Sequence, residues 1–180
     1  MIIFISIQRQ TMKYFTSLIF SLTIVLFSGC ISHPQSAQEF RVAIPDAFMA
    51  EVETITVNRP FAEVAKTFKK KAPKCLDVKI KTVSQSNTSY QVLIAQYNPT
   101  VVIGAKKAEL HLQRHYESGV MNVSQEPKDG YYLLVVDAIP ISKNKTKIVF
   151  YRPSMGFDSL ITAIKGWASG DNLGCPDLTQ

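Results

Sequence analysis

The sequence lacks the motifs by which common catalytic and nucleotide-binding sites are recognised. It contains no Gly-x-Ser-x-Gly segment, which would present a nucleophilic serine on a strand-to-helix turn, and no phosphate-binding P-loop. No other set of nucleophile, base and orienting group stands out along the chain. We therefore predict no catalytic residues and no cofactor, and we expect a protein that is not an enzyme.

Histidine is scarce, and its placement argues against a bound metal ion. His33 lies in a segment without periodicity, whereas His111 and His115 belong to ELHLQRHYE, which alternates like a β-strand. Residues four apart in a strand are separated by about 13 Å, which is too far for one metal ion to bridge. We predict no metal site.

A long apolar run is also missing. The uncharged apolar run at 14–27 has 14 residues, whereas a membrane-spanning helix needs roughly 20. A lysine precedes this run, and no acidic residue lies before Cys30. This pattern is typical of a secretory signal peptide. Met1 and Met12 are both candidate starts, because the residues before Met12 are unusually apolar for the beginning of such a signal.

The end of this run, LFSGC at 26–30, resembles the lipobox of bacterial lipoproteins, in which a leucine-like residue and two small residues precede a cysteine. Phe27 stands where leucine is commonest, and Ser28 and Gly29 are the small residues. The resemblance implies cleavage before Cys30, a diacylglycerol thioether on its sulfur and an acyl chain such as palmitate on its new amino group. The alternative is an ordinary signal peptide with an unrelated cysteine.

Acyl chains on Cys30 would hold the protein on a membrane without spanning it, because each buried methylene adds about 0.8 kcal/mol to the free energy of membrane binding. Ile31 stands where an aspartate tends to retain such lipoproteins at the inner membrane. The resemblance therefore implies an outer-membrane anchor with the domain in the periplasm. Exposure at the cell surface is a second orientation.

Two cysteines remain, Cys75 and Cys175. An exported protein folds in an oxidising compartment, and once Cys30 is assigned to lipid only one pairing is left. We favour a Cys75–Cys175 disulfide over two separate buried thiols. Such a bond closes a loop of about 100 residues and would stabilise the fold by roughly 4.7 kcal/mol in the chain-entropy model.

Three segments follow from these patterns. Residues 1–29 are the lipoprotein signal peptide, and 30–48 form the lipidated N-terminus and a flexible tether, because the region is rich in polar residues and holds two prolines. FRVAIP, at 40–45, is a candidate short edge strand. Residues 49–180 form a single α+β domain.

The domain begins with a strand at 51–57 and a helix. Pro60 is favoured at a helix start, and apolar residues recur at i, i+3, i+4 and i+7 from Phe61 to Phe68. Pro73 is expected to end this helix. Its lysine cluster at 66–71 is interpreted as a solvated face rather than a lipid or nucleic-acid patch.

The pattern then changes to period two, which predicts a sheet of about six strands, mostly antiparallel. Gly104 is a candidate β-bulge, and Pro99 closes one strand. The expected strands are LDVKIKTV, YQVLIAQY, TVVIGAKKAELHLQRHYE, GVMNVSQ, YYLLVVDAIPI and TKIVFYRP, with PKDG as a turn. A long amphipathic helix follows, with Asp158 as N-cap and Gly170 as its stop, and it should cover the apolar face of the sheet.

The segments ITVNRPFAEVAKTF and SLITAIKGWASG resemble the opening and the gripping helix of helix-grip domains of the START-like superfamily. The resemblance covers about residues 50–170 by order and rhythm. It implies a space between sheet and C-terminal helix for an apolar ligand. The chain departs from the family in showing no second short helix after the first.

Asp137 interrupts the apolar strand LLVVDAIP. If buried, it needs a partner, for which Arg114 and Arg152 are candidates; otherwise it faces water at the end of the strand. Aromatic residues within the strands are interpreted as core rather than as a ligand cage: Tyr90, Tyr97, Tyr131, Tyr132, Phe150 and Tyr151.

The formal charge is +6 for the chain and +4 from Cys30 onward, where 18 basic residues face 14 acidic ones. We interpret this mild excess mainly as favouring solubility, and we predict no nucleic-acid partner. The leading hypothesis is a membrane-anchored, non-enzymatic lipoprotein that binds an apolar small molecule or an envelope protein. The alternatives are an envelope hydrolase with an unrecognised site and a surface-exposed adhesin or immunogenic lipoprotein.

Overall fold

The computed structural model describes residues 33–85, 90–117, 126–153 and 155–179. These residues form an α+β domain whose strands make one antiparallel sheet, as the period-two pattern predicted, accompanied by three α-helices and a short 3-10 helix. The sheet has six described strands including β1, whereas about six were predicted after that first strand. In chain order the elements are α2 (Ala37–Ala43), η1 (Ile44–Asp46), β1 (Ala50–Val57), α3 (Phe61–Leu76), β2 (Val78–Gln85), β3 (Tyr90–Ile103), β4 (Ala108–Tyr116), β5 (Tyr131–Ser142), β6 (Lys145–Pro153) and α4 (Asp158–Ser169).

The sheet has the order β1-β6-β5-β4-β3-β2, with every neighbouring pair antiparallel. Hairpins join consecutive strands from β2 to β6, and β1 then pairs with β6, so that Ile55 lies opposite Ile148. Strands β1 and β2 are the two edges of this sheet, and α3 is the connection between them.

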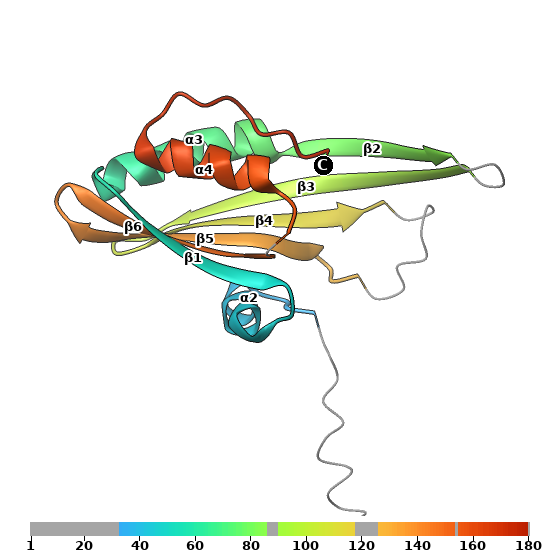
Figure 1. Ribbon diagram of the computed structural model, residues 1–180, viewed down its shortest axis with the longest axis horizontal. Coiled ribbons are helices and arrows are strands. Elements are labelled where there is room, and N and C mark those ends of the chain that lie inside the picture. Colours follow the sequence, from blue (N-terminus) through green and yellow to red (C-terminus); the bar gives the residue numbers. More distant parts are fainter. Residues whose placement is uncertain (1–32, 86–89, 118–125, 154, 180) are drawn as a thin grey trace, which may run out of the picture. The chain divides into compact units, whose positions relative to one another are not determined.

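Helices α3 and α4 lie side by side on one face of the sheet, and α2 lies on the other (Figure 1). The alternation of side chains along each strand explains the two faces. On β4, Leu110 and Leu112 join the core beneath α3 and α4, whereas Glu109 and His111 point toward α2.

The layer between the sheet and the two helices is filled by large side chains. Trp167 and Phe68 from the helices and Phe150 from β6 are all 0% exposed. Fully burying one large apolar side chain contributes about 1.5–3 kcal/mol, so this layer contributes strongly to the stability of the domain. The apolar faces predicted for both helices are therefore confirmed.

Both ends of α4 have residues in the left-handed backbone region. Gly170, with φ of 94°, ends the helix as expected, because glycine enters this region without a steric penalty. Asp158 is the first helical residue and not the N-cap, which is Phe157 with φ of 62°. The carboxylate of Asp158 still lies in the first turn, where it suits the helix dipole.

Pro73 lies inside α3 and does not end it, contrary to the expectation from its sequence. A proline in a helix removes one backbone hydrogen bond at a cost of about 3 kcal/mol. The turn that follows is nevertheless kept, because Cys75 and Leu76 are buried in the core.

Two expectations about strand β3 were wrong, one about Pro99 and one about Gly104. The strand continues through Pro99, which lies opposite Leu112 of β4. Gly104 is not a bulge but begins the β3–β4 turn, where its N–H donates to the carbonyl of Lys107 at 2.8 Å. The pairing of β3 with β4 on both sides of Pro99 keeps the strand intact across it. The segment predicted as one long strand is thus the end of β3, a turn and β4.

The turn at PKDG is confirmed, since the N–H of Gly130 donates to the carbonyl of Pro127 at 2.8 Å. The strand predicted at GVMNVSQ falls on 119–125, which lies outside the described residues.

The expected tether is much shorter than predicted. Within 30–48, α2 and η1 form a helical segment that packs on the sheet through Phe40 and Ile44, and the predicted edge strand at FRVAIP does not form. Ser36 caps α2 by accepting a hydrogen bond from the N–H of Glu39 at 3.1 Å. The carboxylate of Glu39 in turn accepts one from the N–H of Gln35 at 2.8 Å.

Candidate functional site

Of the three cysteines, Cys30 lies outside the described residues. The other two form the predicted pair, since the sulfur atoms of Cys75 and Cys175 lie 2.01 Å apart as a disulfide. This bond fastens the last turn of α3 to the chain segment that follows α4.

That C-terminal segment runs back along α3 and α4 (Figure 1). The ammonium of Lys71 on α3 donates to the carbonyl of Leu173 at 2.7 Å, and the indole N–H of Trp167 donates to that of Gly174 at 3.4 Å. Leu173 also packs onto Gly166 so closely that a Cβ there would lie 2.2 Å from its side chain. The hydroxyl of Ser159 on α4 also donates to the carbonyl of Asp177 at 2.5 Å. The segment is therefore held by a covalent bond, hydrogen bonds to both helices and a close contact.

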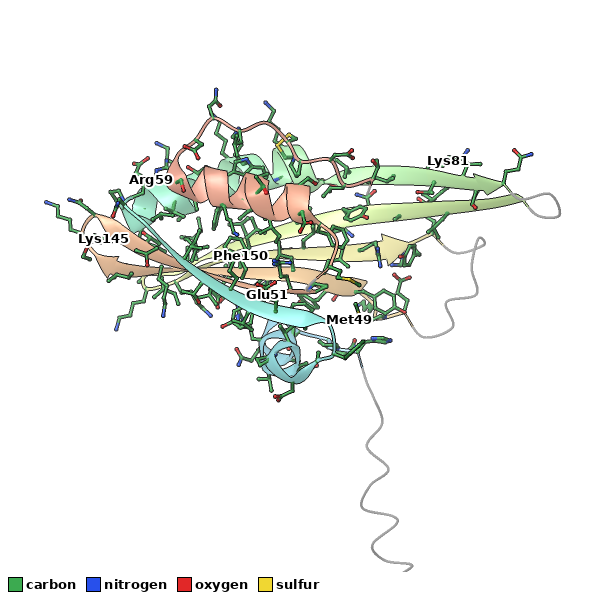
Figure 2. All side chains as sticks on the ribbon, viewed as in Figure 1. Met49, Glu51, Arg59, Lys81, Lys145 and Phe150 are labelled. Carbon is green, nitrogen blue, oxygen red and sulfur yellow. A yellow bond between two sulfur atoms is a disulfide. The ribbon has the colours of Figure 1, made fainter. Side chains whose placement is uncertain are left out.

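Arg59, labelled in Figure 2, joins the other end of α3 to α4. One guanidinium nitrogen donates to the carbonyl of Trp167 at 2.9 Å, and another donates to the hydroxyl of Thr67 at 3.0 Å. A cation at the last carbonyls of a helix complements the helix dipole. The hydrogen-bonding capacity of Arg59 is thus largely used inside the fold.

Two adjoining hollows lie between α3 and the C-terminal segment, and we call them together the basic groove. The first has a volume of about 240 Å³ and the second about 250 Å³. Lys70, Lys71 and Asn172 line both. The first also contains Arg59, Glu63, Lys66, Thr67, Gly170 and Asp171, and the second contains Lys74, Cys75, Gly174 and Cys175.

The positive charge of the protein is concentrated beside this groove. Residues 59–74 hold six basic residues and one acidic residue, a charge of +5. Because the chain from Cys30 onward carries +4, the rest of that part of the chain sums to −1. The small positive net charge of this part of the chain therefore comes from the basic residues of α3 and the adjoining Arg59.

Most of these cations have no partner in the fold. Within the described residues, no ion pair or hydrogen bond involves the side-chain ammonium of Lys66, Lys69, Lys70 or Lys74. Lys66, Lys70 and Lys74 recur every four residues, which places them in one row along α3. Like charges at this spacing destabilise a helix by about 0.2–0.5 kcal/mol per pair.

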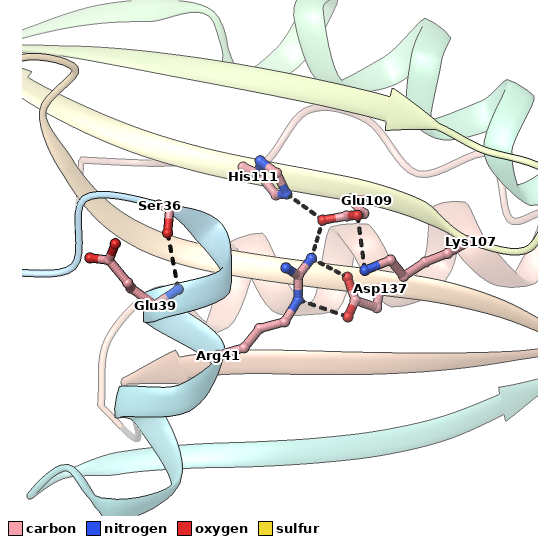
Figure 3. A network of polar contacts seen from close by, with 7 residues as sticks. All are labelled: Ser36, Glu39, Arg41, Lys107, Glu109, His111 and Asp137. Carbon is pink, nitrogen blue, oxygen red and sulfur yellow. Dashed lines mark hydrogen bonds and ion pairs between the residues drawn. The ribbon is translucent and has the colours of Figure 1, made fainter.

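The opposite face of the sheet carries a compact charge network around Arg41 of α2 (Figure 3). Its guanidinium donates to both carboxylate oxygens of Asp137 on β5, at 2.9 and 2.6 Å, and also contacts Glu109 on β4. Glu109 further contacts the ammonium of Lys107 at 2.9 Å and the ring of His111 at 3.0 Å. Every charge in this network faces an opposite charge or a hydrogen-bond partner.

The network shifts two pKa values. Burial acts to raise the pKa of Glu109, but hydrogen bonds from Lys107, Arg41 and His111 outweigh it and lower that pKa to about 2. Burial acts to lower the pKa of Arg41, whereas its bonds to Asp137 and Glu109 raise it above the ordinary value. Both groups are therefore held in their charged forms, as in a structural clamp.

Asp137 is buried at 4% exposure, which settles the alternative left open by the sequence. Its partner is Arg41 and neither predicted arginine: Arg152 pairs with Glu51 at 2.8 Å, and Arg114 lies 4.8 Å over the ring of Tyr116. Arg41 was missed because α2 was interpreted as a tether.

A sequence signal for α2 did exist. Ser36 and Glu39 match the capping-box pattern Ser-x-x-Glu, and an apolar residue follows at Phe40. The two prolines nearby and a helix of only two turns hid this signal. Recognising it would have placed Arg41 on a helix and made it a candidate partner for Asp137.

The two strand histidines do not meet. His111 contacts Glu109, whereas His115 lies beside Glu126 at 3.3 Å. His115 borders a polar hollow of about 500 Å³ on this face, together with Asn98, Thr100, Gln113, Lys128, Asp129 and Tyr132. In the part of the chain that the structure describes, no group of three or more potential metal ligands comes together.

The strand aromatics separate by face. Phe150 and Tyr97 belong to the core beneath α3 and α4, while Tyr132 and Tyr151 pack beside α2. Burial raises the pKa of Tyr132, consistent with a packing role. The side chain of Tyr90 lies outside the described residues.

No protein-family model and no curated protein sequence matches the chain. Among the residues that the structure describes, none of the helices has both the length and the apolar character needed to cross a bilayer.

Proposed function

We propose that the chain is a lipid-anchored protein of the bacterial envelope whose domain binds a partner at its surface. The observation that carries this proposal is the location of the described hollows. They lie on the outside of the domain, while the layer between sheet and helices is occupied by Trp167, Phe68 and Phe150. A drug-sized apolar ligand in that layer would need a cavity of roughly 300 Å³ or more. Surface binding is therefore favoured over a ligand enclosed by the fold.

The short connection to Cys30 supports a position close to the membrane. Among the described residues the first element is α2, which Ser36 caps, and a fully extended chain spans at most about 3.6 Å per residue. If Cys30 carries the acyl chains, the N-cap residue Ser36 of α2 lies within about 22 Å of the anchor. The outer membrane, with the domain in the periplasm, remains our proposed location, on the basis of Ile31.

A catalytic role receives less support than a binding role. The only described group with a pKa lowered to about 2 is Glu109, and its charge is neutralised by Lys107 and Arg41. Such pairing suits a structural network, since the pKa of a catalytic acid or base usually lies near the working pH. We therefore propose a non-enzymatic protein.

We also propose a relationship to helix-grip domains. The element order of strand, helix, antiparallel strands and C-terminal helix, with β1 placed beside β6, supports it. The chain departs from that family after α3, because only Asp77 separates this helix from β2. Any ligand carried over from that family stays an analogy, since a fold does not define a function.

Replacing the lipid-accepting thiol tests the anchor. Cys30→Ser should move the protein from the membrane fraction to the soluble fraction or leave it as an unprocessed precursor. Ile31→Asp is the matched variant, which should keep membrane attachment but shift the protein to the inner membrane. Membrane attachment and processing of Cys30→Ser equal to wild type would refute lipidation at this residue.

Native mass spectrometry of the protein purified from cells tests the surface-binding part separately. The expected mass is that of the processed chain with its own acyl groups. A further lipid-sized mass that carries no phosphate group and survives gentle activation would contradict surface binding and favour an enclosed apolar site. Cleavage of the domain by protease added to intact cells would instead favour the surface-exposed alternative.

A further inference from the structure

The basic groove differs from an ordinary solvated helix face in having fixed walls. The Cys75–Cys175 disulfide and the hydrogen bond from Lys71 to Leu173 hold the C-terminal segment opposite α3. The lysines of α3 therefore line a hollow of defined width. The position of the C-terminal segment opposite α3 is an observation independent of the charge of the lysines.

The charge distribution within the groove points to an anionic occupant. The second hollow contains Lys70, Lys71 and Lys74 and no acidic residue, whereas Glu63 and Asp171 border only the first. Lys70 and Lys74 have no partner within the described residues, and their mutual repulsion opposes helix formation. An anion bound between them would remove that repulsion.

The chemistry of the free cations narrows the class of anion. The fork of an arginine matches carboxylate and phosphate groups bidentately, but the guanidinium of Arg59 is occupied by Trp167 and Thr67. The available groups are ammonium ions, which act as compact point charges and suit phosphate. The side-chain amide of Asn172 adds a donor shared by both hollows.

We propose that the basic groove binds a phosphate-bearing anion, with its main charge at Lys70 and Lys74 and a second phosphate reaching the first hollow. The anion is a diphosphate or a similar group, supplied either by a soluble molecule or by a lipid headgroup. This inference rests on the proposed surface-binding role and does not depend on the anchor at Cys30.

The test uses inorganic pyrophosphate and the full protein as purified from cells, in detergent, by isothermal titration calorimetry. Wild type should bind, with an affinity that falls as salt rises. Lys70→Gln combined with Lys74→Gln should weaken binding at least tenfold. The matched control is Lys143→Gln combined with Lys145→Gln, which removes the same charge from the exposed β5–β6 hairpin and should change binding less than twofold.

Three results would overturn the assignment: no binding by wild type, equal losses in both double variants, or equal affinity for an oligoglutamate peptide of matched charge. Thermal unfolding of each variant checks that binding was not lost through misfolding. Because calorimetry is done on the purified protein, it remains informative even if Cys30 proves not to be lipidated.

A second arm identifies the source of the phosphate. The protein is reconstituted into nanodiscs of zwitterionic lipid, with or without phosphatidic acid. If headgroups occupy the groove, phosphatidic acid should weaken pyrophosphate binding in the discs at least fivefold. Unchanged pyrophosphate binding in both discs supports a soluble phosphate-bearing ligand, and loss of binding in both overturns the proposal.

Discussion

Glu109 shows how one carboxylate on a strand can hold several elements together. Its neighbours are Lys107 in the turn just before β4, His111 on β4 and Arg41 on α2. The hydrogen bonds that they supply outweigh the cost of burial and lower the pKa of Glu109. At the scale of the residue, the face of the sheet that α2 covers is therefore stabilised by paired charges as well as by apolar contacts.

This pairing makes stability depend on pH in the acidic range. The pKa of Glu109 is about 2 in the folded protein against an ordinary value of 4.5, so its contribution is complete above about pH 4.5. It is lost as the pH falls toward 2, because the unfolded state then binds a proton that the folded state resists. The shift corresponds to about 3 kcal/mol at most.

We expect Glu109→Gln to lose stability at pH 7 and to show a flatter dependence of unfolding free energy on pH between 4.5 and 2. Urea denaturation across that range measures both effects. Glu117→Gln, which removes the half-exposed pair with Lys79, is the control and should cost less than about 1 kcal/mol. A pH dependence of Glu109→Gln identical to wild type would show that Glu109 is not paired.

At the scale of the element, α2 depends on its contacts with the sheet. A helix of two turns is not stable alone in water, because nucleation costs more than so few hydrogen bonds return. Phe40 and Ile44 pack against Val135, and the bonds of Arg41 to Asp137 fix the position of the helix. The element next to the proposed anchor is thus joined to the middle of the sheet.

Arg41→Ala should be strongly destabilising, by about 3–5 kcal/mol, because it leaves the buried carboxylate of Asp137 without its partner. Hydrogen exchange should show faster exchange at the amides of α2 than in the wild type. Arg41→Met combined with Asp137→Leu should recover part of the loss, since the unpaired carboxylate of Asp137 is removed and Glu109 keeps Lys107 and His111 as partners. Equal exchange rates in wild type and Arg41→Ala would contradict the clamp.

The elements also show what could be predicted from the sequence. β1, β5, β6, α3 and α4 were predicted because a buried face imposes its period on several consecutive residues. The predictions at Pro73 and Pro99 were wrong. We expected the energetic cost of proline to end the helix and the strand, but tertiary packing outweighs that cost. Helix α2 was missed because two turns give too few repeats for a period to be visible.

At the scale of the whole molecule, the disulfide joins parts of the chain that are 100 residues apart. It encloses the strands β2 to β6 and α4 in one covalent loop. The same bond fixes one wall of the basic groove. A single pair of thiols thus acts on both the stability of the domain and the geometry of its candidate site.

Replacing both residues, Cys75→Ser with Cys175→Ser, should lower the unfolding free energy by about 2–5 kcal/mol, since the unfolded chain regains the freedom of a long loop. Thermal and urea unfolding with and without a reducing agent measure the loss. The reducing agent should destabilise the wild type and leave the double variant unchanged. Reduction without any effect on the wild type would argue against the bond.

The sequence by itself determined the class of fold, the alternation of buried and exposed residues, and the pairing of Cys75 with Cys175. These depend on local periodicity and on counting, both of which are visible along one chain. Lipidation at Cys30 and a location in the outer membrane are predictions of the same kind, and they await the fractionation experiment.

Only the tertiary structure decided which other distant groups meet. It placed Arg41 against Asp137 across the sheet, and it placed the C-terminal segment beside the lysines of α3. The physical reason is that an ion pair or a groove wall depends on separation in space. The chain brings these residues together only after the hydrophobic core has fixed the order of the strands and the positions of the helices.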